Sequence, residues 1–432
     1  MNNRQNSISF IRRYRLIFVP LLIFLFGGGA LLLLNRSTPE PVRLPYWELP
    51  PPELPVVDPS DLAPDAVDID SDRVFPSLTY GIQTFFWWDE MHRSLGLQHV
   101  NLLEFSHIRH VFAWRDIEPV YHEADAPQRY IWANADAVVN EAESYGVEIV
   151  ARLDAPPDWA VVAPEDYDAD VPPFDMARLI DYCGAVAERY RGRIVGYQIW
   201  NEPNLDREWG NFPPSPDAYA ELLAGCSAAV RTADPDAIII SAGLAPTGTR
   251  SPQAMPHDEF LWAMYAAGAG DHFDVMGVHA PGYRSPPEAD PADLADGDLP
   301  WMSFRYVEYM RAMMVANGDA HKQIAIMETG WTIDPRPDSE YHWFSVTPEQ
   351  QGDYLMRAYR YAAENWRPWV GLMVTIYYPN PAWTEDDEEF WWAIGTNAPW
   401  PFGFADRPAW WTLLRMEKIS THPDYAHPAR PE

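Results

Sequence analysis

The chain has 432 residues, a formal net charge of −32 and a hydrophobic content of 47%. This composition excludes a disordered chain, and the length accommodates either up to about three domains or one (β/α)₈ barrel with insertions. The strong acidic balance argues against nucleic acid and other anionic polymers as partners.

The first expected element is a membrane anchor at residues 16–34. The run from Leu16 to Leu34 is apolar and about long enough to span a bilayer. Four arginines and no acidic residue lie in the preceding segment, residues 1–15, which favours a cytoplasmic N-terminus. A cleaved signal peptide is the alternative, but Leu31 to Leu34 stand where a cleavage site needs small residues. The sequence therefore predicts an uncleaved single-pass anchor in the cell membrane, with all that follows on the extracellular side.

A proline-rich linker is expected next, at residues 35–74. Nine prolines lie between Thr38 and Asp65, mixed with acidic residues. Such a stretch does not form a helix and favours an extended, semi-rigid stalk, with plain disorder as the alternative. In either state it holds the folded body, residues 75–422, away from the lipid. Residues 423–432 are expected to be a short C-terminal tail.

The body alternates strand and helix patterns eight times. The expected strands are Tyr80–Thr84, Ile108–Ala113, Val147–Leu153, Ile194–Trp200, Ala237–Ala242, Phe273–His279, Gln323–Glu328 and Val370–Tyr377. The expected helices are Asp89–Gly96, Ala133–Tyr145, Met176–Tyr190, Pro216–Ala233, Asp258–Ala267, Phe304–Ala316, Pro348–Trp366 and Pro408–Ile419. Eight strands that are each followed by a helix predict an α/β protein with a (β/α)₈ barrel rather than an open sheet.

Two glutamates occupy the positions where functional residues of such a barrel gather, the C-terminal ends of strands. Glu202 ends the fourth strand in YQIWNEPN, and Glu328 ends the seventh in QIAIMETGW. A charged residue at the end of an apolar run adds little to packing and is costly to bury, so it needs another reason to be there. Two carboxylates that face one gap are what cleavage of a glycosidic bond requires.

With these motifs the chain resembles glycoside hydrolase clan A, the retaining (β/α)₈ enzymes that include families 5 and 39. IWNEPN and METGW carry the resemblance, and AVAERYRGRIVGYQIWNEPN and RTADPDAIIISAG are similar to stretches of the family 39-like branch. The resemblance implies that Glu202 is the general acid/base and Glu328 the nucleophile. It also implies that Asn201 binds the 2-hydroxyl of the sugar.

The resemblance extends to supporting residues on the second and sixth strands. Arg109 matches an arginine near the nucleophile, where a bidentate guanidinium would hold Glu328 ionised. Trp114 ends the same strand and is expected either to floor the cleft or to pack in the core. His279 matches the histidine of the sixth strand, but Pro281 stands where the clan has a tyrosine, and Tyr283 is the candidate to replace that tyrosine.

The eighth strand departs from the clan pattern. The clan places a tryptophan there beneath the sugar, whereas this strand ends in IYYPNPAW, so Tyr377 or Trp383 is expected to serve. Trp331 fits the family pattern E-x-G-W and is a further candidate for substrate binding. Asp154, at the end of the third strand, is expected either to line the cleft or to pair with Arg152.

Neither a cofactor nor a metal is expected. The acidic loops lack the ligand spacing of a calcium site, and cysteine and histidine do not show metal-type spacing. Cys183 and Cys226 fall in two consecutive helices. A disulfide is possible on the extracellular side, but two buried thiols are the favoured interpretation.

The sequence therefore predicts a membrane-anchored, extracellular retaining glycosidase. Its substrate is expected to be a β-linked oligosaccharide or polysaccharide, and its oligomeric state is open. Two alternatives remain. One is a catalytically silent glycan-binding scaffold on the same barrel, and the other is a transglycosylase, in which a sugar acceptor replaces water.

Overall fold

The computed structural model describes residues 45–54, 69, 73–123, 129–162, 173–295, 297–396 and 407–419. The chain divides into two units, residues 1–50 and 51–432. In the first unit the described part is a 3₁₀ turn, η1 (Tyr46–Glu48). The expected anchor at residues 16–34, most of the expected linker and the expected tail lie outside the described residues. No helix in the described ranges is both long and apolar enough to cross a bilayer.

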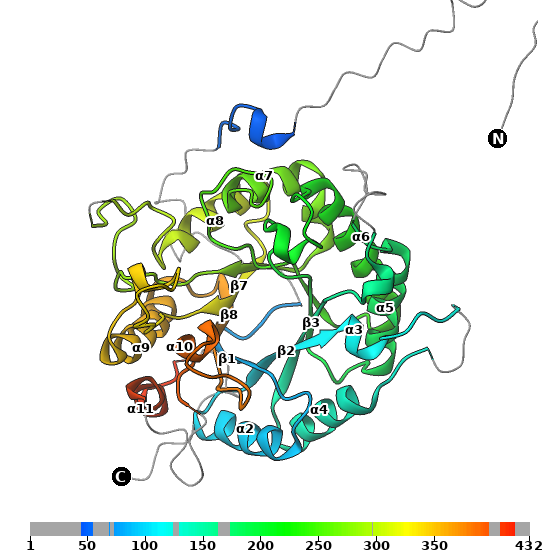
Figure 1. Ribbon diagram of the computed structural model, residues 1–432, viewed down its shortest axis with the longest axis horizontal. Helices are drawn as coiled ribbons and strands as arrows, with labels where there is room; N and C mark the ends of the chain where they lie inside the picture. Colours follow the sequence, from blue (N-terminus) through cyan, green and yellow to red (C-terminus); the bar gives the residue numbers. More distant parts are fainter. Residues whose placement is uncertain are drawn as a thin grey trace, which may run out of the picture. The chain divides into compact units, whose positions relative to one another are not determined.

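The second unit contains a closed barrel of eight parallel strands that follow one another in chain order (Figure 1). The predicted (β/α)₈ barrel is therefore confirmed. The strands are β1 (Thr79–Thr84), β2 (His107–Ala113), β3 (Glu148–Asp154), β4 (Gly196–Ile199), β5 (Ile238–Ile240), β6 (Val275–His279), β7 (Gln323–Thr329) and β8 (Val370–Thr375).

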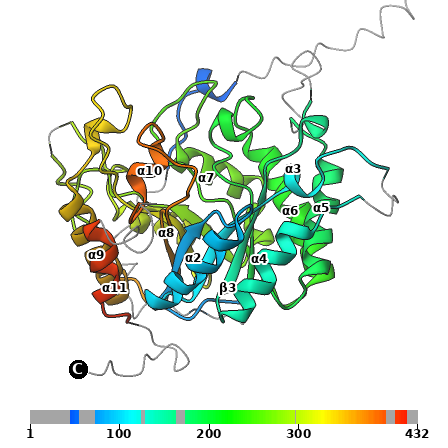
Figure 2. The same ribbon diagram turned by 60° about the horizontal axis from the view of Figure 1, so that its bottom comes forward.

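The helices lie on the outside of the strands (Figure 2). The longer ones are α2 (Glu90–Leu102), α4 (Ala133–Ser144), α5 (Met176–Arg189), α6 (Pro216–Ala233), α7 (His257–Ala266), α8 (Tyr306–Ala316), α9 (Pro348–Asn365) and α11 (Pro408–Arg415). Short helical turns are α3 (Trp114–Ile117), η4 (Asp158–Ala160), η6 (Asp206–Glu208), η7 (Ala269–His272), η8 (His342–Phe344) and α10 (Glu388–Trp392).

Helix boundaries follow the capping residues of the sequence, with one clear difference. Ser215 accepts a hydrogen bond from the backbone N–H of Ala218 and starts α6 where expected. By contrast, α2 runs six residues past Gly96, where the sequence predicts its end. A Cβ at Gly96 would lie 2.2 Å from the Phe86 ring. This glycine therefore makes room for the ring to pack against the helix, and it does not end the helix.

The barrel interior is divided by polarity. An apolar cluster contains residues from five strands and the segment before β1, namely Phe75, Val150, Ile238, Ile240, Val275, Ala325, Met327, Leu372 and Val374. Burial of one such side chain contributes about 1.5–3 kcal/mol. Further along the strands the interior side chains are polar. Among them are Gln83 of β1 and Arg109 of β2, which pair in register. The apolar cluster supports this polar layer, which contains the site described below.

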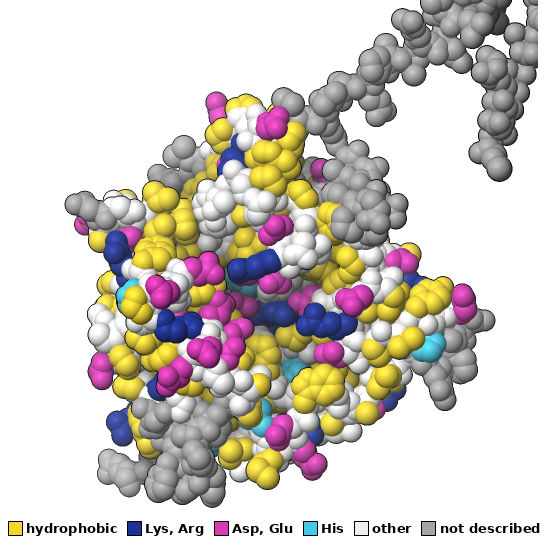
Figure 3. Space-filling model, viewed as in Figure 1, with side chains coloured by type: hydrophobic (Ala, Val, Ile, Leu, Met, Phe, Trp, Pro, Cys, Tyr) yellow, Lys and Arg dark blue, Asp and Glu magenta, His cyan; other side chains and the backbone are white. Residues whose placement is uncertain are grey.

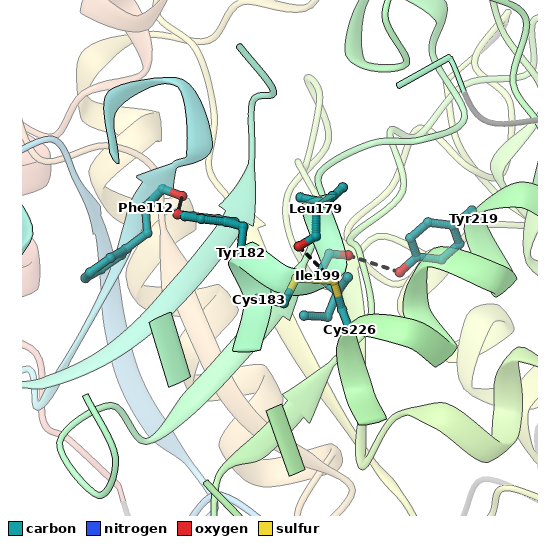
Figure 4. The surroundings of a disulfide bond; sticks show 7 residues. All are labelled: Phe112, Leu179, Tyr182, Cys183, Ile199, Tyr219 and Cys226. Carbon is teal, nitrogen blue, oxygen red and sulfur yellow. Dashed lines mark hydrogen bonds between the residues drawn. A yellow bond between two sulfur atoms is a disulfide. The ribbon is translucent and has the colours of Figure 1, made fainter. Parts of the chain in front are cut away.

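A disulfide joins α5 to α6 (Figure 4). The preferred prediction of two thiols was therefore wrong: Cys183 and Cys226 are bonded, with their Cα atoms 5.4 Å apart. Small residues let the two helices approach, since a Cβ at Gly225 would lie 2.2 Å from the Ile180 side chain. Closing a loop across 43 residues stabilises the fold by on the order of 4 kcal/mol in the chain-entropy account.

Candidate active site

The two glutamates lie at the same end of the barrel on different kinds of backbone. Glu328 is the penultimate residue of β7, whereas Glu202 lies three residues after the end of β4. Trp200 and Glu202 both have positive φ, 72° and 43°, a conformation that costs a non-glycine residue roughly 1–2 kcal/mol. The Trp200 ring stacks on Phe174 at 4.7 Å, and the backbone N–H of Glu202 donates to the Gly243 carbonyl. Packing and this hydrogen bond hold the turn that presents Glu202.

The two carboxylates and the His279 imidazole meet in one gap. One oxygen of Glu202, one of Glu328 and one ring nitrogen of His279 all lie within 4.8 Å of one another. Nδ1 of His279 is 2.8 Å from Oε1 of Glu202 and 3.7 Å from Oε2 of Glu328. The side chains of Glu202 and Glu328 are 14% and 15% exposed, so both are shielded yet still reachable from solvent.

Arg109 is fully buried beneath this gap and connects its parts. Its Nη1 donates to Glu328 at 2.5 Å and to Gln83 at 2.9 Å, its Nε donates to Gln198, and its Nη2 donates to Oδ1 of Asn201 at 2.8 Å. The expected bidentate pair with Glu328 is therefore not formed, because Nε and Nη2 bind the amides of Gln198 and Asn201. Since the Asn201 oxygen is occupied, its Nδ2 group remains the donor for an outside acceptor.

The surroundings of Glu328 favour its charged form. Burial by itself would raise its pKa. The charges of His279, Arg109 and Arg152, together with the hydrogen bond from Arg109, outweigh burial and hold the pKa of Glu328 below its usual value. Glu328 is therefore a carboxylate at neutral pH, which is the state that a nucleophile or metal ligand requires.

Gly243, which follows β5, makes room for the histidine. A Cβ at this position would lie 2.1 Å from Cδ2 and 2.3 Å from Nε2 of His279. The same glycine accepts the backbone hydrogen bond of Glu202. One small residue thus sets the position of both Glu202 and the imidazole that contacts it.

Aromatic side chains adjoin the Glu328 side of the gap. Tyr377 and Trp383 follow β8, as expected, and are half-buried with ring centroids 5.4 Å apart. Phe85, directly after β1, completes the cluster at 5.8 Å from Tyr377 and 5.2 Å from Trp383. Burial raises the pKa of Tyr377 above its usual value, and the negative charge of Glu328 raises it further. The Tyr377 hydroxyl and the Glu328 carboxylate are therefore close. Sequence reasoning missed Phe85, although its position at a strand end was the available signal.

Two other predicted residues do not reach the gap, and a third lies near Glu202 without a hydrogen bond to it. Trp114 and Trp331 are fully buried. Their indole N–H groups donate to Glu118 and to the Ser285 carbonyl. Both therefore pack in the core and offer a substrate no surface, which corrects the expectation for Trp331 and selects the core alternative for Trp114. The Tyr283 hydroxyl donates to the Pro246 carbonyl, and no hydrogen bond joins it to either glutamate within the described residues.

The neighbourhood of Glu202 also contains charged groups that the sequence analysis did not single out. Nη2 of Arg207 lies 4.0 Å from Oε2 of Glu202, and this arginine is 59% exposed. Burial, followed by the charge of Glu202, raises the pKa of Glu208 to about 7.

Asp154 forms an ion pair with Arg152 at 2.7 Å, which is the structural alternative expected for that aspartate. Acidic and basic side chains gather around the middle of this face in Figure 3.

Two carboxylates and an imidazole are also a donor set for a divalent metal. Glu202, His279 and Glu328 are close enough together to hold one. However, guanidinium groups already lie against both carboxylates, Arg109 against Glu328 and Arg207 against Glu202. Their positive charges oppose a cation between the carboxylates. The arrangement is therefore better suited to proton transfer and nucleophilic attack than to metal binding.

Comparison with known proteins gives matches at the level of structure. Neither a family model nor a curated protein matches the chain. A family 39 glycoside hydrolase from the gut symbiont Bacteroides cellulosilyticus WH2 is similar, with a TM-score of 0.57 and 17% identity over 85% of this chain and 66% of that chain. A monomeric β-xylosidase from Caulobacter crescentus CB15 has a TM-score of 0.54 and 18% identity over 82% of this chain and 71% of that one.

A third similar structure is native xylanase 10B from Thermotoga maritima. Its TM-score is 0.51, and its identity is 16% over 80% of this chain and 97% of that chain. At such identities the likeness establishes a shared barrel fold. The chemistry of this chain has to be argued from its own residues.

Proposed function

We propose that this protein is a retaining glycoside hydrolase of clan A, similar to family 39, that cleaves a β-linked glycan or glycoside. The observation that carries the proposal is the pair of carboxylates, Glu202 and Glu328, with oxygens no more than 4.8 Å apart at one end of the barrel. Retaining glycosidases place their two carboxyl groups about 5–5.5 Å apart, and inverting ones about 6.5–9.5 Å apart to admit a water molecule. The spacing in this chain supports the retaining class.

In the first step Glu328 is the nucleophile. Its carboxylate attacks the anomeric carbon while Glu202 donates its proton to the departing glycosidic oxygen, so the glycosidic bond breaks as the glycosyl–enzyme bond forms. Arg109 and His279 keep Glu328 ionised beforehand, as the lowered pKa of this group indicates. The Oδ1 atom of Asn201 accepts from Arg109, which leaves the Nδ2 group to donate to a sugar hydroxyl, a contact that strengthens in the transition state.

In the second step Glu202 is the general base. It takes a proton from a water molecule, the water oxygen attacks the anomeric carbon, and the bond to Glu328 breaks with net retention of configuration. The hydrogen bond between His279 and Glu202, and Arg207 at 4.0 Å, both adjoin the carboxylate whose protonation has to change.

We also propose that residues 16–34 anchor the protein in the cell membrane and that the catalytic body is extracellular. The disulfide between Cys183 and Cys226 supports an oxidising environment, because such bonds persist mainly outside the cytosol. Membrane fractionation of expressing cells, followed by external protease, tests this arrangement. The expected result is full-length protein in the membrane fraction and release of the body from intact cells. A mature chain in the medium that starts near Arg36 would contradict the anchor.

Turnover of a panel of aryl β-glycosides by the full-length protein tests the function. The expected result is release of the aryl group from at least one sugar, with the β-anomer as the first product detected by NMR. A first product of the α-configuration would contradict retention. If no glycoside or polysaccharide is cleaved, the silent glycan-binding scaffold is the better interpretation.

A further inference from the structure

A cavity of about 450 Å³ lies next to the catalytic gap, at the ends of β1, β2 and β3 and beside the segment that follows β8. We call it the Trp88 pocket. It is lined by Phe85, Trp87, Trp88, His92, Arg115 and Arg152, among others. Its volume lies within the range of about 300–1,000 Å³ that is typical of small-molecule sites. Neither glutamate lines it, so the chemistry described above does not account for it.

Two residues of the Trp88 pocket connect it to the surroundings of Glu328. Phe85 lines the pocket and also packs against Tyr377, whose ring lies near Glu328. Arg152 lines the pocket, and its charge helps to lower the pKa of Glu328. The pocket also lies at the same ends of the barrel strands as the gap. Its natural occupant is therefore a second part of the molecule that is bound at the catalytic pair.

The lining combines an aromatic surface with polar groups that lack partners. Trp88 is 74% exposed, which is unusual for so large an apolar ring. Nε1 of Trp87 and Nε2 of His92 have no hydrogen-bond partner within the described residues, although the two residues are only 6% and 7% exposed. Leaving a buried polar group unpaired costs about 1–3 kcal/mol. Both nitrogens have almost no accessible surface, so the exposed ring of Trp88 is the part of this wall that a ligand can contact.

Arg152 supplies further donors. Its Nε lies 2.7 Å from Asp154, whereas neither Nη1 nor Nη2 forms a hydrogen bond with another described residue. An aromatic face with a nearby array of N–H donors matches a pyranose ring, which has apolar C–H faces and a rim of hydroxyl groups.

The charges of the pocket favour an uncharged sugar. Arg152 is paired with Asp154, and Arg115 is next to Asp116, whose pKa it lowers against the larger raising effect of burial. Burial also lowers the pKa of His92 to about 4, so this histidine is neutral at pH 7. The pocket therefore lacks the surplus positive charge that would select a uronate or a sulfated sugar.

We propose that the Trp88 pocket binds a second, uncharged sugar unit of the substrate, stacked on Trp88 and adjacent to the unit that Glu328 attacks. This inference rests on the proposed glycosidase function. It means that the enzyme selects glycans of at least two units, rather than single sugars with an arbitrary leaving group.

Binding to an inactive full-length protein tests the pocket independently of turnover. The probes are β-1,4-linked xylo- and cello-oligosaccharides of one to four units, titrated calorimetrically into the Glu328→Gln variant. We expect affinity to rise at least about tenfold from one unit to two or three in one series. Adding Trp88→Ala should abolish that rise, and Trp88→Phe should retain most of it. Trp411→Ala, which removes a 40% exposed tryptophan on the outer helix α11, is the matched control and should retain all of it.

Several outcomes overturn the proposal: no dependence of affinity on length, a dependence that Trp88→Ala leaves intact, or no binding of any neutral oligosaccharide. Tighter binding of a glucuronate-containing oligosaccharide than of its neutral counterpart overturns the uncharged class. Circular dichroism melting curves of all variants establish that they are folded.

The test separates the two proposals. If aryl monosaccharides are hydrolysed but affinity shows no Trp88-dependent length effect, the pocket proposal fails and the glycosidase stands. If the length effect is present and no glycoside is cleaved, the glycosidase proposal fails and the protein is a glycan-binding barrel.

Discussion

The two glutamates of the gap have nearly equal exposure but different supports. Glu328 lies within strand β7 and is bonded to Arg109, which is fully buried and is itself held by three amides. Glu202 lies on a loop, in a left-handed backbone conformation, and its neighbours are an imidazole and an exposed arginine. A rigid, fully charged environment suits a carboxylate that stays ionised. A loop position beside an imidazole and an exposed guanidinium suits one that must gain and lose a proton in each cycle.

Replacing Glu328 tests the rigid side of this comparison and should have the largest effect. Glu328→Ala removes the attacking atom itself, so kcat/KM should fall by about 10⁴-fold or more on natural glycosides and on dinitrophenyl glycosides alike. Steady-state kinetics with both substrate classes measure this loss. Any product formed with added azide should have the inverted configuration, and a retained azide product would contradict the assignment of Glu328 as nucleophile.

Replacing Glu202 should separate the two substrate classes. Glu202→Ala removes the proton donor, so activity on natural glycosides should fall by roughly 10²–10⁴-fold. Release of dinitrophenolate, which needs no proton, should be affected much less. The glycosyl-enzyme should then accumulate and be visible by mass spectrometry. Added azide should restore turnover with retained configuration. If this variant were equally inactive on both substrates, the roles of the two glutamates would have to be exchanged.

Removing the guanidinium beneath Glu328 tests what holds its charge. In the wild type the pKa of Glu328 is lowered, so ionised Glu328 contributes stability above its unfolded value of 4.5. That contribution is lost as pH falls through the lower folded value. Arg109→Met leaves a shielded carboxylate without this partner, which should cost about 3–5 kcal/mol in unfolding free energy at pH 7. Urea unfolding curves at pH 7 and pH 4 measure it.

The same variant has a kinetic signature. The acid limb of the pH profile of kcat/KM should move to higher pH in Arg109→Met, since Glu328 would lose a charge that lowers its pKa. Arg207→Met, which removes the exposed guanidinium near Glu202 instead, is the matched control and should not shift the limb that reports Glu328. Equal shifts in both variants would contradict the distinction between the two sides.

The smallest expected effect concerns Gly243. Gly243→Ala would place a methyl group 2.1 Å from the His279 ring, so the imidazole has to move away from Glu202. We expect a loss of about 10- to 100-fold in kcat with a change in stability of about 1–3 kcal/mol. Gly184→Ala on α5 is the control, because its Cβ would make only an ordinary 3.4 Å contact with Ala229. Equal kinetics of the two variants would show that the histidine position does not matter.

The order of the elements could be read from the sequence because it depends on local patterns. All eight strands and the helices after them are present, with Glu328 at the end of β7 and Glu202 three residues after the end of β4. Where prediction failed, the deciding contact was long-range. Gly96 resembles a helix end, yet it is buried against Phe86 within a longer helix. Cys183 and Cys226 are bonded because small residues bring α5 and α6 together, which no local pattern reveals.

The sequence by itself determined the barrel and the two strands whose C-terminal ends carry the carboxylates. Strand and helix periodicity and the order of connections are encoded along the chain. Only the tertiary structure decided which side chains share the gap. Trp331 is three residues after Glu328 in the motif and is fully buried in the core. The surroundings of the gap instead include side chains from three different loops or strands, namely Arg207, Phe85 and Arg152. Barrel closure brings distant strand ends together, and the direction of each side chain depends on packing partners that lie far away in the sequence.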